Sequence, residues 1–224
     1  AAYARLGADV VVTGTGRNPD SFPDDEKAVN WRDVESTADE VRALARRALT
    51  MTVDVTNQEH VQAMIDGAVA EFGRVDILVN NAAFARGADR VPVADLTPDL
   101  FNLVMDIKVG GTFYCTKAFM EQITKQGEGG KIVNISSSAG KRGSSNTLAY
   151  NAANFAVVGM TQSMAKELGP HKINVNCVCP GAVDTSRMDE IVNTEIWQEL
   201  ASNTPIGRNG TDDEVGDFVA YLCT

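Results

Sequence analysis

The stretch from residue 131 to residue 154 reads KIVNISSSAGKRGSSNTLAYNAAN, and it decides the fold. Three of its first six residues are isoleucine or valine, which is typical of a strand buried on both faces. Three serines and a glycine end this strand. A longer apolar segment at residues 148–168 follows and stops before Gly169-Pro170, as helices often do. A strand, a turn and a helix in this order predict one repeat of an α/β fold.

Similar runs recur along the chain. Strands are predicted at residues 9–13, 49–55, 75–80, 131–136 and 173–178. Helices are predicted at residues 35–45, 57–73, 97–126 and 148–168, with another from residue 212. Thr97-Pro98 marks one helix start, because threonine caps helices and proline suits the first helical position. The alternation predicts a single domain with a doubly wound, Rossmann-like parallel sheet in a three-layer α/β/α arrangement.

Composition limits the classes of partner. The 224 residues include 20 basic and 30 acidic side chains, which give a formal net charge of −10. Such a charge disfavours binding to nucleic acid and to anionic membrane surfaces. No apolar run is long enough to span a membrane. The four cysteines lack metal-ligand spacing, so we expect free thiols in a reducing cytoplasm and no metal site.

Polar or turn-forming residues end the predicted strands. Asp54, Asn80, Ser137 and the Pro180-Gly181 pair each follow or close a strand. Ligands of open parallel sheets bind beyond the carboxyl ends of the strands. Each of these residues alone is also an ordinary turn former. Four such strand ends together favour a binding site.

These residues carry a resemblance to the short-chain dehydrogenase/reductase family. Asn80-Asn81-Ala82-Ala83 resembles the NNAG segment of the family, with alanine in place of the final glycine. The 134–137 segment and Tyr150 match its serine and tyrosine in type and spacing, and the 180–185 segment resembles its PG-x-x-x-T element. Val53-Asp54-Val55 resembles the strand end that contacts adenine. The resemblance extends over nearly the whole chain.

The resemblance implies an oxidoreductase that interconverts a secondary alcohol and a ketone. Tyr150 would exchange a proton with the substrate oxygen, and Ser137 would donate a hydrogen bond to the same oxygen. Asn80, within the segment that includes Ala82, would contact the ribose region of the cofactor. The resemblance also implies that Thr185 and the backbone near Val183 hold the nicotinamide carboxamide. The long helices at residues 97–126 and 148–168 would pack against another subunit in a homodimer or homotetramer.

One departure from the family pattern concerns charge. An isolated tyrosine has a pKa of about 10, and a nearby cation lowers it. In the family, that cation is a lysine four residues after the tyrosine, but Asn154 stands there in this chain. Asn154 can hydrogen-bond to a ribose but carries no charge. Lys108 stands where the family has a catalytic asparagine, so we hypothesise that the two residues are exchanged and that Lys108 supplies the charge. The alternative is that Lys108 points to solvent and Asn154 disables the site.

The cofactor preference rests on the end of the first predicted strand. The family places an acidic residue there to bind the ribose hydroxyls of NAD, but this chain has Gly14 or Thr15. Arg17 follows closely and could bind a 2′-phosphate, which favours NADP over NAD. Alternatively, Arg17 is a solvated loop charge. Arg187 and Met188, after Thr185, could shape a lid over the substrate.

The ends of the chain also differ from the family pattern. The glycine-rich TGxxxGxG segment that follows the first strand of the family is not found in this sequence, nor is the last strand. In the family fold that first strand lies in the middle of the sheet. We therefore expect the natural polypeptide to extend at both ends, since two apolar strands would otherwise have unpaired edges.

Three functions are compatible with these residues. The first is NAD(P)-dependent oxidation or reduction, slowed by Asn154. The second is a catalytically silent member of the fold that serves as a binding or structural subunit. The third is a non-redox enzyme that uses Tyr150 and Ser137 for elimination or isomerisation.

Overall fold

The structure is a computed structural model that describes residues 1–18, 20, 27–28, 31–84, 87–185 and 194–224. These residues form two compact units. Residues 54–179, with Cys223, make up the larger unit. Residues 1–53 and 180–222, with Thr224, make up the smaller unit. None of the helices in the described part of the chain combines the length and the apolar character that a membrane-spanning helix needs.

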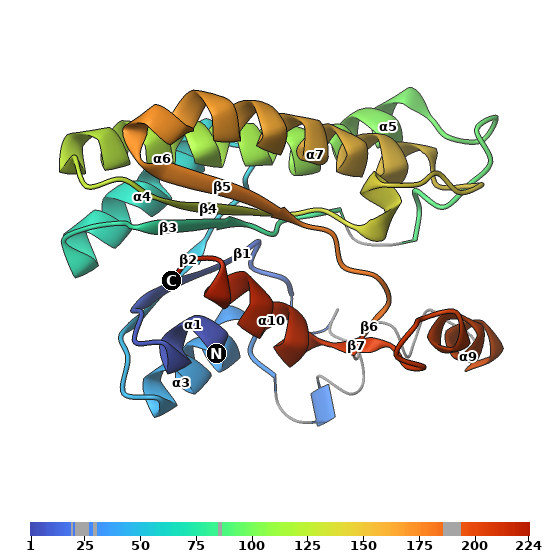
Figure 1. Cartoon of the computed structure of the whole chain (residues 1–224), viewed down its shortest axis with the longest axis horizontal. Helices are drawn as coiled ribbons and strands as arrows, with labels where there is room; N and C mark the ends of the chain where they lie inside the picture. Colours follow the sequence, from blue (N-terminus) through green and yellow to red (C-terminus); the bar gives the residue numbers. More distant parts are fainter. Residues whose placement is uncertain (19, 21–26, 29–30, 85–86, 186–193) are drawn as a thin grey trace. The chain divides into compact units, whose positions relative to one another are not determined.

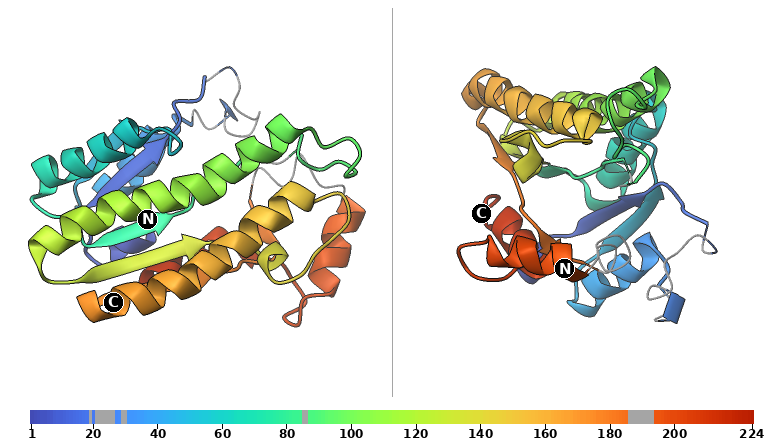
Figure 2. Two further views of the ribbon diagram at one scale, coloured as in Figure 1. Left: turned by 90° about the horizontal axis from the view of Figure 1, so that it is seen from above. Right: turned by 90° about the vertical axis from the view of Figure 1, so that its right-hand side faces the viewer.

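The larger unit is built on a parallel sheet of three strands. Its order is β3 (Ile77–Asn80), β4 (Gly130–Ile135) and β5 (Ile173–Val178). Helices α6 (Gly111–Gln126) and α7 (Leu148–Leu168) run along one face of this sheet (Figure 1). Seen from above, both helices follow the strand direction closely (Figure 2). Helix α4 (Gln58–Phe72) packs against α6.

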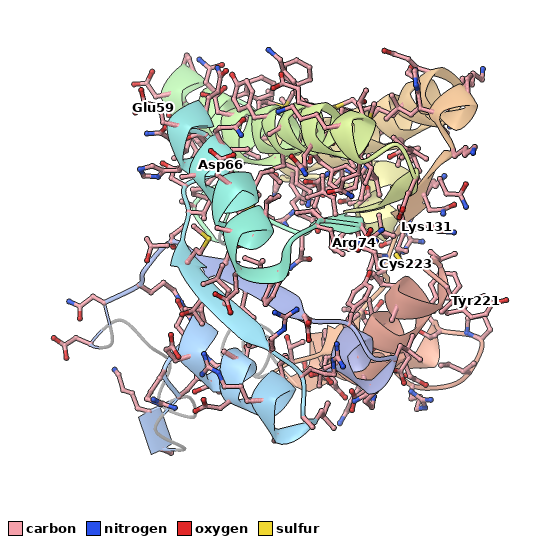
Figure 3. All side chains as sticks on the ribbon, turned by 90° about the vertical axis from the view of Figure 1, so that its left-hand side faces the viewer. Glu59, Asp66, Arg74, Lys131, Tyr221 and Cys223 are labelled. Atoms are coloured by element: carbon pink, nitrogen blue, oxygen red, sulfur yellow. The ribbon has the colours of Figure 1, made fainter. Side chains whose placement is uncertain are left out.

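Helix α4 begins and ends where its sequence predicts. The side chain of Asn57 caps it by accepting hydrogen bonds from the backbone N–H groups of Glu59 and His60. Gly73 ends it in the left-handed conformation, which glycine adopts at little cost. Glu59 and Asp66 lie on the exposed face of the helix (Figure 3). The apolar residues of α4 therefore face the core of the unit.

The helix predicted at residues 97–126 is interrupted in its middle. It begins as α5 (Pro98–Met105), with Thr97 as the cap, and continues after a break as α6. The break is a π-helical turn, η2 (Asp106–Gly110). Such turns are rare within α-helices and are frequently found at functional sites. Here the turn includes Lys108, which is only 5% exposed.

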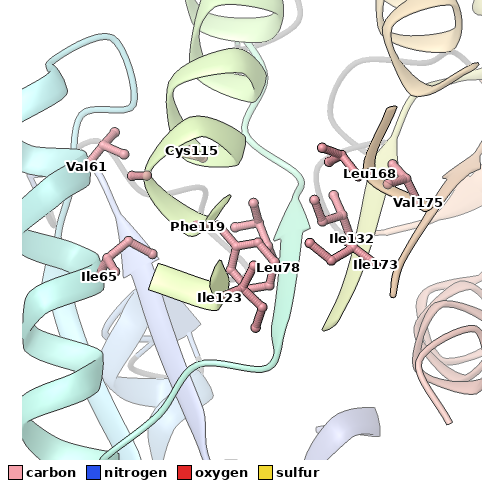
Figure 4. Packing of buried hydrophobic residues seen from close by; sticks show 11 residues of the cluster. Val61, Ile65, Leu78, Cys115, Phe119, Ile123, Ile132, Leu168, Ile173 and Val175 are labelled. Carbon is pink, nitrogen blue, oxygen red and sulfur yellow. The ribbon is translucent and has the colours of Figure 1, made fainter. Parts of the chain in front are cut away.

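The hydrophobic core of the larger unit lies between the sheet and its helices. Phe119 and Ile123 of α6 reach the strands, where they meet Leu78 and Ile132 (Figure 4). Val61 and Ile65 extend the same cluster to α4. Burial of this cluster anchors α6 and α7 to the sheet, because apolar burial is the main favourable contribution to folding.

The smaller unit includes a second parallel sheet. Strand β1 (Val10–Gly14) pairs with β2 (Ala48–Thr52), and helix α3 (Val34–Ala43) packs against both strands. Helix α1 (Ala2–Arg5) packs against α10 (Asp212–Tyr221). The two helices are joined by ion pairs from Arg5 to Asp213 and Asp217. Thr211 and Glu214 form a capping box at the start of α10.

Some elements of the smaller unit were not predicted from the sequence. Strand β6 (Val183–Asp184) pairs with β7 (Gly210–Thr211), and helix α9 (Thr194–Ser202) lies between them in the chain. A strand of two residues has no periodicity to detect. Arg187 and Met188 lie outside the described residues.

Every strand pair in the described residues is parallel, as predicted. Among those residues, β1 pairs with β2 alone and β3 pairs with β4 alone. Both are therefore edge strands of their own sheets.

Candidate functional site

Ser137 and Tyr150 lie on two segments that pack against each other. Strand β4 ends at Ile135, and Ser137 caps the short 3₁₀-helix η3 (Ser138–Gly140) by accepting a hydrogen bond from the N–H of Ala139. Tyr150 lies in the first turn of α7. The η3 turn packs against α7. The strand–turn–helix order predicted from residues 131–154 therefore brings the segments of the two residues together.

Two side chains tie the serine turn to α7. The hydroxyl of Ser136, next to Ser137, donates to the backbone carbonyl of Asn154 at 3.0 Å. Asn151, next to Tyr150, donates from Nδ2 to the carbonyls of Ala139 at 2.7 Å and Arg142 at 2.8 Å. Asn151 also accepts a hydrogen bond from the hydroxyl of Thr147. These contacts hold the turn on the helix on both sides of Ser137.

Gly140 makes this close packing possible. A Cβ atom at this position would lie 2.5 Å from Oγ of Ser136 and 2.8 Å from the backbone oxygen of Asn154. Both distances are shorter than real Cβ contacts. The turn therefore approaches α7 as closely as it does because residue 140 has no side chain.

The structure places Asn154 inside the protein. Its side chain is 2% exposed and donates from Nδ2 to the backbone carbonyl of Tyr150 at 2.9 Å. Its Oδ1 atom lies 3.4 Å from the hydroxyl of Ser136. Asn154 thus helps to join α7 to the serine turn.

Lys108 is also turned inward. Its ammonium donates to the backbone carbonyl of Ala82 at 3.1 Å, just beyond the end of β3. Burial lowers the pKa of Lys108 to about 8, because the charged form loses its hydration. Among the described residues, no hydrogen bond joins Lys108 to Tyr150. The sequence alternative in which Lys108 points to solvent is wrong.

A residue that the sequence did not single out contacts Tyr150. The guanidinium carbon of Arg90 lies 3.8 Å from the centre of the Tyr150 ring. Arg90 belongs to the loop between β3 and α5, and its backbone N–H closes a turn on the carbonyl of Gly87. No motif or periodicity marks this loop, so only its folded conformation could identify the contact.

A buried polar chain crosses the larger unit beside these residues. Asn80 donates from Nδ2 to the hydroxyl of Thr116 at 3.2 Å and to Oδ1 of Asn134 at 2.9 Å. Asn134 in turn donates to the hydroxyl of Thr161 at 2.9 Å. Both amide hydrogens of Asn80 are therefore used inside the protein. Its carbonyl oxygen is the side-chain atom that can accept a hydrogen bond from a ligand.

Asp54 and Val55 begin the larger unit. Asp54 accepts hydrogen bonds from the backbone N–H and the hydroxyl of Thr56, and these bonds lower the pKa of its carboxyl. Val55 packs so closely against Gly111 that a Cβ atom there would lie 2.6 Å from the valine side chain. Asp54 is exposed, and Val55 is fixed against α6.

The smaller unit includes the other predicted cofactor contacts. Arg17 forms an ion pair with Asp33, in which the nitrogen and oxygen are 3.0 Å apart. A carboxylate oxygen of Asp33 would lie 3.2 Å from a Cβ atom added at Gly14, where β1 ends. A carboxylate and a guanidinium therefore lie together next to this strand end. They are the groups that recognise ribose hydroxyls and a 2′-phosphate, so their chemistry fits an adenosine ribose.

The remaining predicted contacts follow β5 in the sequence. Pro180 and Gly181 precede β6, which includes Val183 and pairs with β7. Thr185 is exposed just after this strand. Trp197 of α9 donates from its indole N–H to the carboxylate of Asp184 at 2.6 Å. This bond ties α9 to the segment that includes Val183 and Thr185.

Known proteins resemble this chain in sequence and in architecture. A family model described as enoyl-(acyl carrier protein) reductase matches residues 24–224. The 2-dehydro-3-deoxy-D-gluconate 5-dehydrogenase of Dickeya dadantii is 33% identical over 197 residues, which cover 88% of this chain and 77% of the relative. The chain belongs to the short-chain dehydrogenase/reductase family.

Solved structures agree with this membership. A 7α-hydroxysteroid dehydrogenase complexed with NADH and 7-oxo glycochenodeoxycholic acid is 29% identical, with a TM-score of 0.84 over 99% of this chain and 79% of that chain. Carveol dehydrogenase from Mycobacterium avium, in complex with NAD, is 27% identical, with a TM-score of 0.84 over 99% of this chain and 83% of that chain. The short-chain dehydrogenase/reductase described here is thus an NAD(P)-dependent oxidoreductase of that family with a Rossmann-like α/β fold, as predicted.

Proposed function

We propose that the protein interconverts a secondary alcohol and a ketone, with Tyr150 as the acid–base and Ser137 as the hydrogen-bond donor to the substrate oxygen. One observation carries the proposal: Ser136 and Asn151 hold the serine turn on the helix of Tyr150. A catalytic pair requires such support, because its groups must keep a fixed separation throughout the reaction.

In the oxidation direction, the phenolate of Tyr150 takes the hydroxyl proton while the carbon–hydrogen bond breaks and a C=O bond forms. A bound oxidised nicotinamide would accept the hydride that leaves the carbon. In the reduction direction, Tyr150 returns the proton to the developing alkoxide. Ser137 stabilises the negative charge on that oxygen, as a positioned donor does at a developing oxyanion.

A direct assay tests this function. The purified protein is mixed with NADPH or NADH and a panel of cyclic, sugar-derived and aromatic ketones, and absorbance is followed at 340 nm. Substrate-dependent loss of absorbance is the expected result. Cofactor binding by fluorescence without any turnover would favour the silent binding subunit instead. Conversion of a substrate by elimination or isomerisation, with no change at 340 nm, would favour the non-redox enzyme.

The cofactor contacts would come from several segments. Asp54 and Val55 would contact adenine, and Asn80 and Ala82 the ribose region. Asn154, predicted to be a cofactor contact, is not among them, because its amide is buried and bonds to the backbone of Tyr150. The segment with Pro180, Gly181, Val183 and Thr185 would hold the carboxamide of the nicotinamide. We propose NADP as the cofactor, with NAD as the alternative, because the guanidinium of Arg17 can bind a 2′-phosphate.

The Arg17–Asp33 pair gives a test of this choice. We expect Arg17→Gln to weaken NADPH binding about ten-fold, as the loss of a charge-assisted hydrogen bond does, and to change NADH binding little. Asp33→Asn removes the competing carboxylate, so it should weaken NADH binding and spare NADPH. Fluorescence titration of both cofactors measures these affinities. If Arg17→Gln weakened the binding of NADPH and of NADH equally, Arg17 would not contact the 2′ position.

A further proposal concerns assembly. Leu103 on α5, Phe113 on α6, and Leu148 and Phe155 on α7 are large apolar side chains exposed by between 45% and 50%. Exposed apolar side chains on α5, α6 and α7 favour a contact with another subunit, so we propose a homodimer or homotetramer. We expect sedimentation velocity to give a dimer or tetramer, and Phe113→Glu to shift it towards the monomer. A monomer at micromolar concentration would contradict the proposal.

The four free cysteines support the proposed cytoplasmic location.

A further inference from the structure

The loop between β3 and α5 places a cation on the ring of Tyr150. Arg90 stacks its guanidinium on this ring, with 3.8 Å between the guanidinium carbon and the ring centre. A cation in this position is attracted by the face of an aromatic ring. The attraction is stronger when the ring oxygen is negatively charged, because two opposite charges then face each other.

The side chain of Arg90 lies against a buried carboxylate. Its Nε atom lies 3.6 Å from Oδ1 of Asp89, and Asp89 is 2% exposed. Among the described residues, neither of these two buried atoms has a hydrogen-bond partner. The side chain of Arg90 is itself only 22% exposed. The guanidinium is thus partly removed from water, where electrostatic effects are larger than at an open surface.

Asn154 carries no charge, so it cannot supply a positive charge beside Tyr150. The side-chain amide of Asn154 donates a hydrogen bond to the backbone carbonyl of Tyr150, and the ammonium of Lys108 donates to the backbone carbonyl of Ala82. Within the described residues, Arg90 is the positively charged side chain in contact with the Tyr150 ring. We propose that Arg90 is a positioning residue that fixes the ring of Tyr150 and supplies the positive charge that favours its phenolate. The proposal rests on the proposed role of Tyr150 as acid–base.

Other charged groups bear on the expected size of the effect. The charged side chains on the 87–90 turn, on α5, on η2 and directly after η3 are, besides Arg90, Asp89, Asp99, Asp106, Lys108, Lys141 and Arg142. Asp89 offsets part of the charge of Arg90, because it lies against the guanidinium. Lys108 loses its proton near pH 8 and therefore needs its own comparison variant.

The experiment measures the ionisation of Tyr150 without cofactor or turnover. The protein is labelled with ¹³Cζ-tyrosine, and the Tyr150 signal is assigned from its loss in Tyr150→Phe. We expect Arg90→Gln, which keeps a planar side chain but no charge, to move the titration of this signal to higher pH by about half to one unit. Arg90→Lys should stay close to the parent protein, and Lys108→Met should leave the titration in place.

The outcomes separate charge from packing. Equal titration of Arg90→Gln and the parent protein overturns the proposal. Equal shifts in Arg90→Gln and Arg90→Lys also overturn it, because packing and not charge would then be responsible. If the Tyr150 signal titrates at higher pH in Lys108→Met but not in Arg90→Gln, Lys108 and not Arg90 supplies the charge. If Arg90→Gln fails to fold, Arg90→Met keeps the apolar stem and provides the same neutral comparison.

A second measurement connects the contact to the reaction. In the oxidation direction at pH 7, kcat of Arg90→Gln should fall about five-fold, and the deficit should close as the pH rises, because oxidation uses the phenolate as the base. KM should change little, because the contact is with Tyr150 and not with the substrate. An inactive parent protein would contradict the proposed function but not the NMR result, so the two failures remain distinguishable. A five-fold deficit that is the same at every pH would overturn the charge role.

Discussion

Tyr150→Phe should reduce kcat by a factor on the order of 10² to 10⁴, because it removes the group that exchanges a proton with the substrate oxygen. The ring remains, so its contact with Arg90 and the fold of α7 should persist. Absorbance at 340 nm measures the rate, and circular dichroism checks that the fold is intact. Cofactor affinity should change little, since the hydroxyl acts on the substrate.

Tyr221→Phe is the matched control. Tyr221 is 69% exposed on α10, so loss of its hydroxyl should leave both the rate and the stability unchanged. Full activity in Tyr150→Phe would remove Tyr150 from the reaction. Equal loss of activity in both variants would point to a general effect of the substitution and not to the site.

Gly140→Ala should lower both the stability and the activity. The added methyl group would lie 2.5 Å from Oγ of Ser136 and 2.8 Å from the backbone oxygen of Asn154, and a helix backbone cannot easily yield. Overpacking of this kind costs about 1–3 kcal/mol. Because relief of the clash moves the serine turn away from α7, we expect kcat to fall by about ten-fold or more. Urea unfolding and the 340 nm assay measure the two effects.

Gly143→Ala provides the control on the same turn. A Cβ atom at Gly143 meets no atom within 4 Å, and its φ angle is not in the left-handed region. This variant should therefore unfold at the same urea concentration as the parent protein, or slightly above it, and keep its rate. If Gly140→Ala behaved like Gly143→Ala, the close packing of the serine turn on α7 would be wrong.

The regular elements could be predicted because their signals are local. Strand β5 and helix α7 begin and end at the residues expected from the apolar runs and from Gly169-Pro170. The cap at Thr97 was also readable, since a cap depends on one side chain and its next few neighbours. The π-helical turn in the 97–126 helix was not, because a wider turn has no residue signature of its own.

Only the part of the candidate site that depends on spacing along the chain could be predicted from the sequence. Ser137 and Tyr150 are thirteen residues apart on a strand–turn–helix, so their approach follows from the fold. The partners of Asn154 and Lys108 depend on which face each side chain turns inward. The contact of Arg90 depends on a loop that has no periodicity, and therefore only the folded structure identifies it.

The buried amides of Asn80 and Asn134 also affect how the chain finds its fold. The two residues lie opposite each other on β3 and β4, and Thr116 and Thr161 continue their hydrogen bonds to α6 and α7. In strands that are apolar on both faces, the apolar side chains alone distinguish poorly between one register and the next. Here a slip of a single residue would turn these amides to the opposite face and leave them without partners. The hydrogen bonds that join Thr116, Asn80, Asn134 and Thr161 therefore favour a single register of β3 on β4. They also fix the positions of α6 and α7 on the sheet.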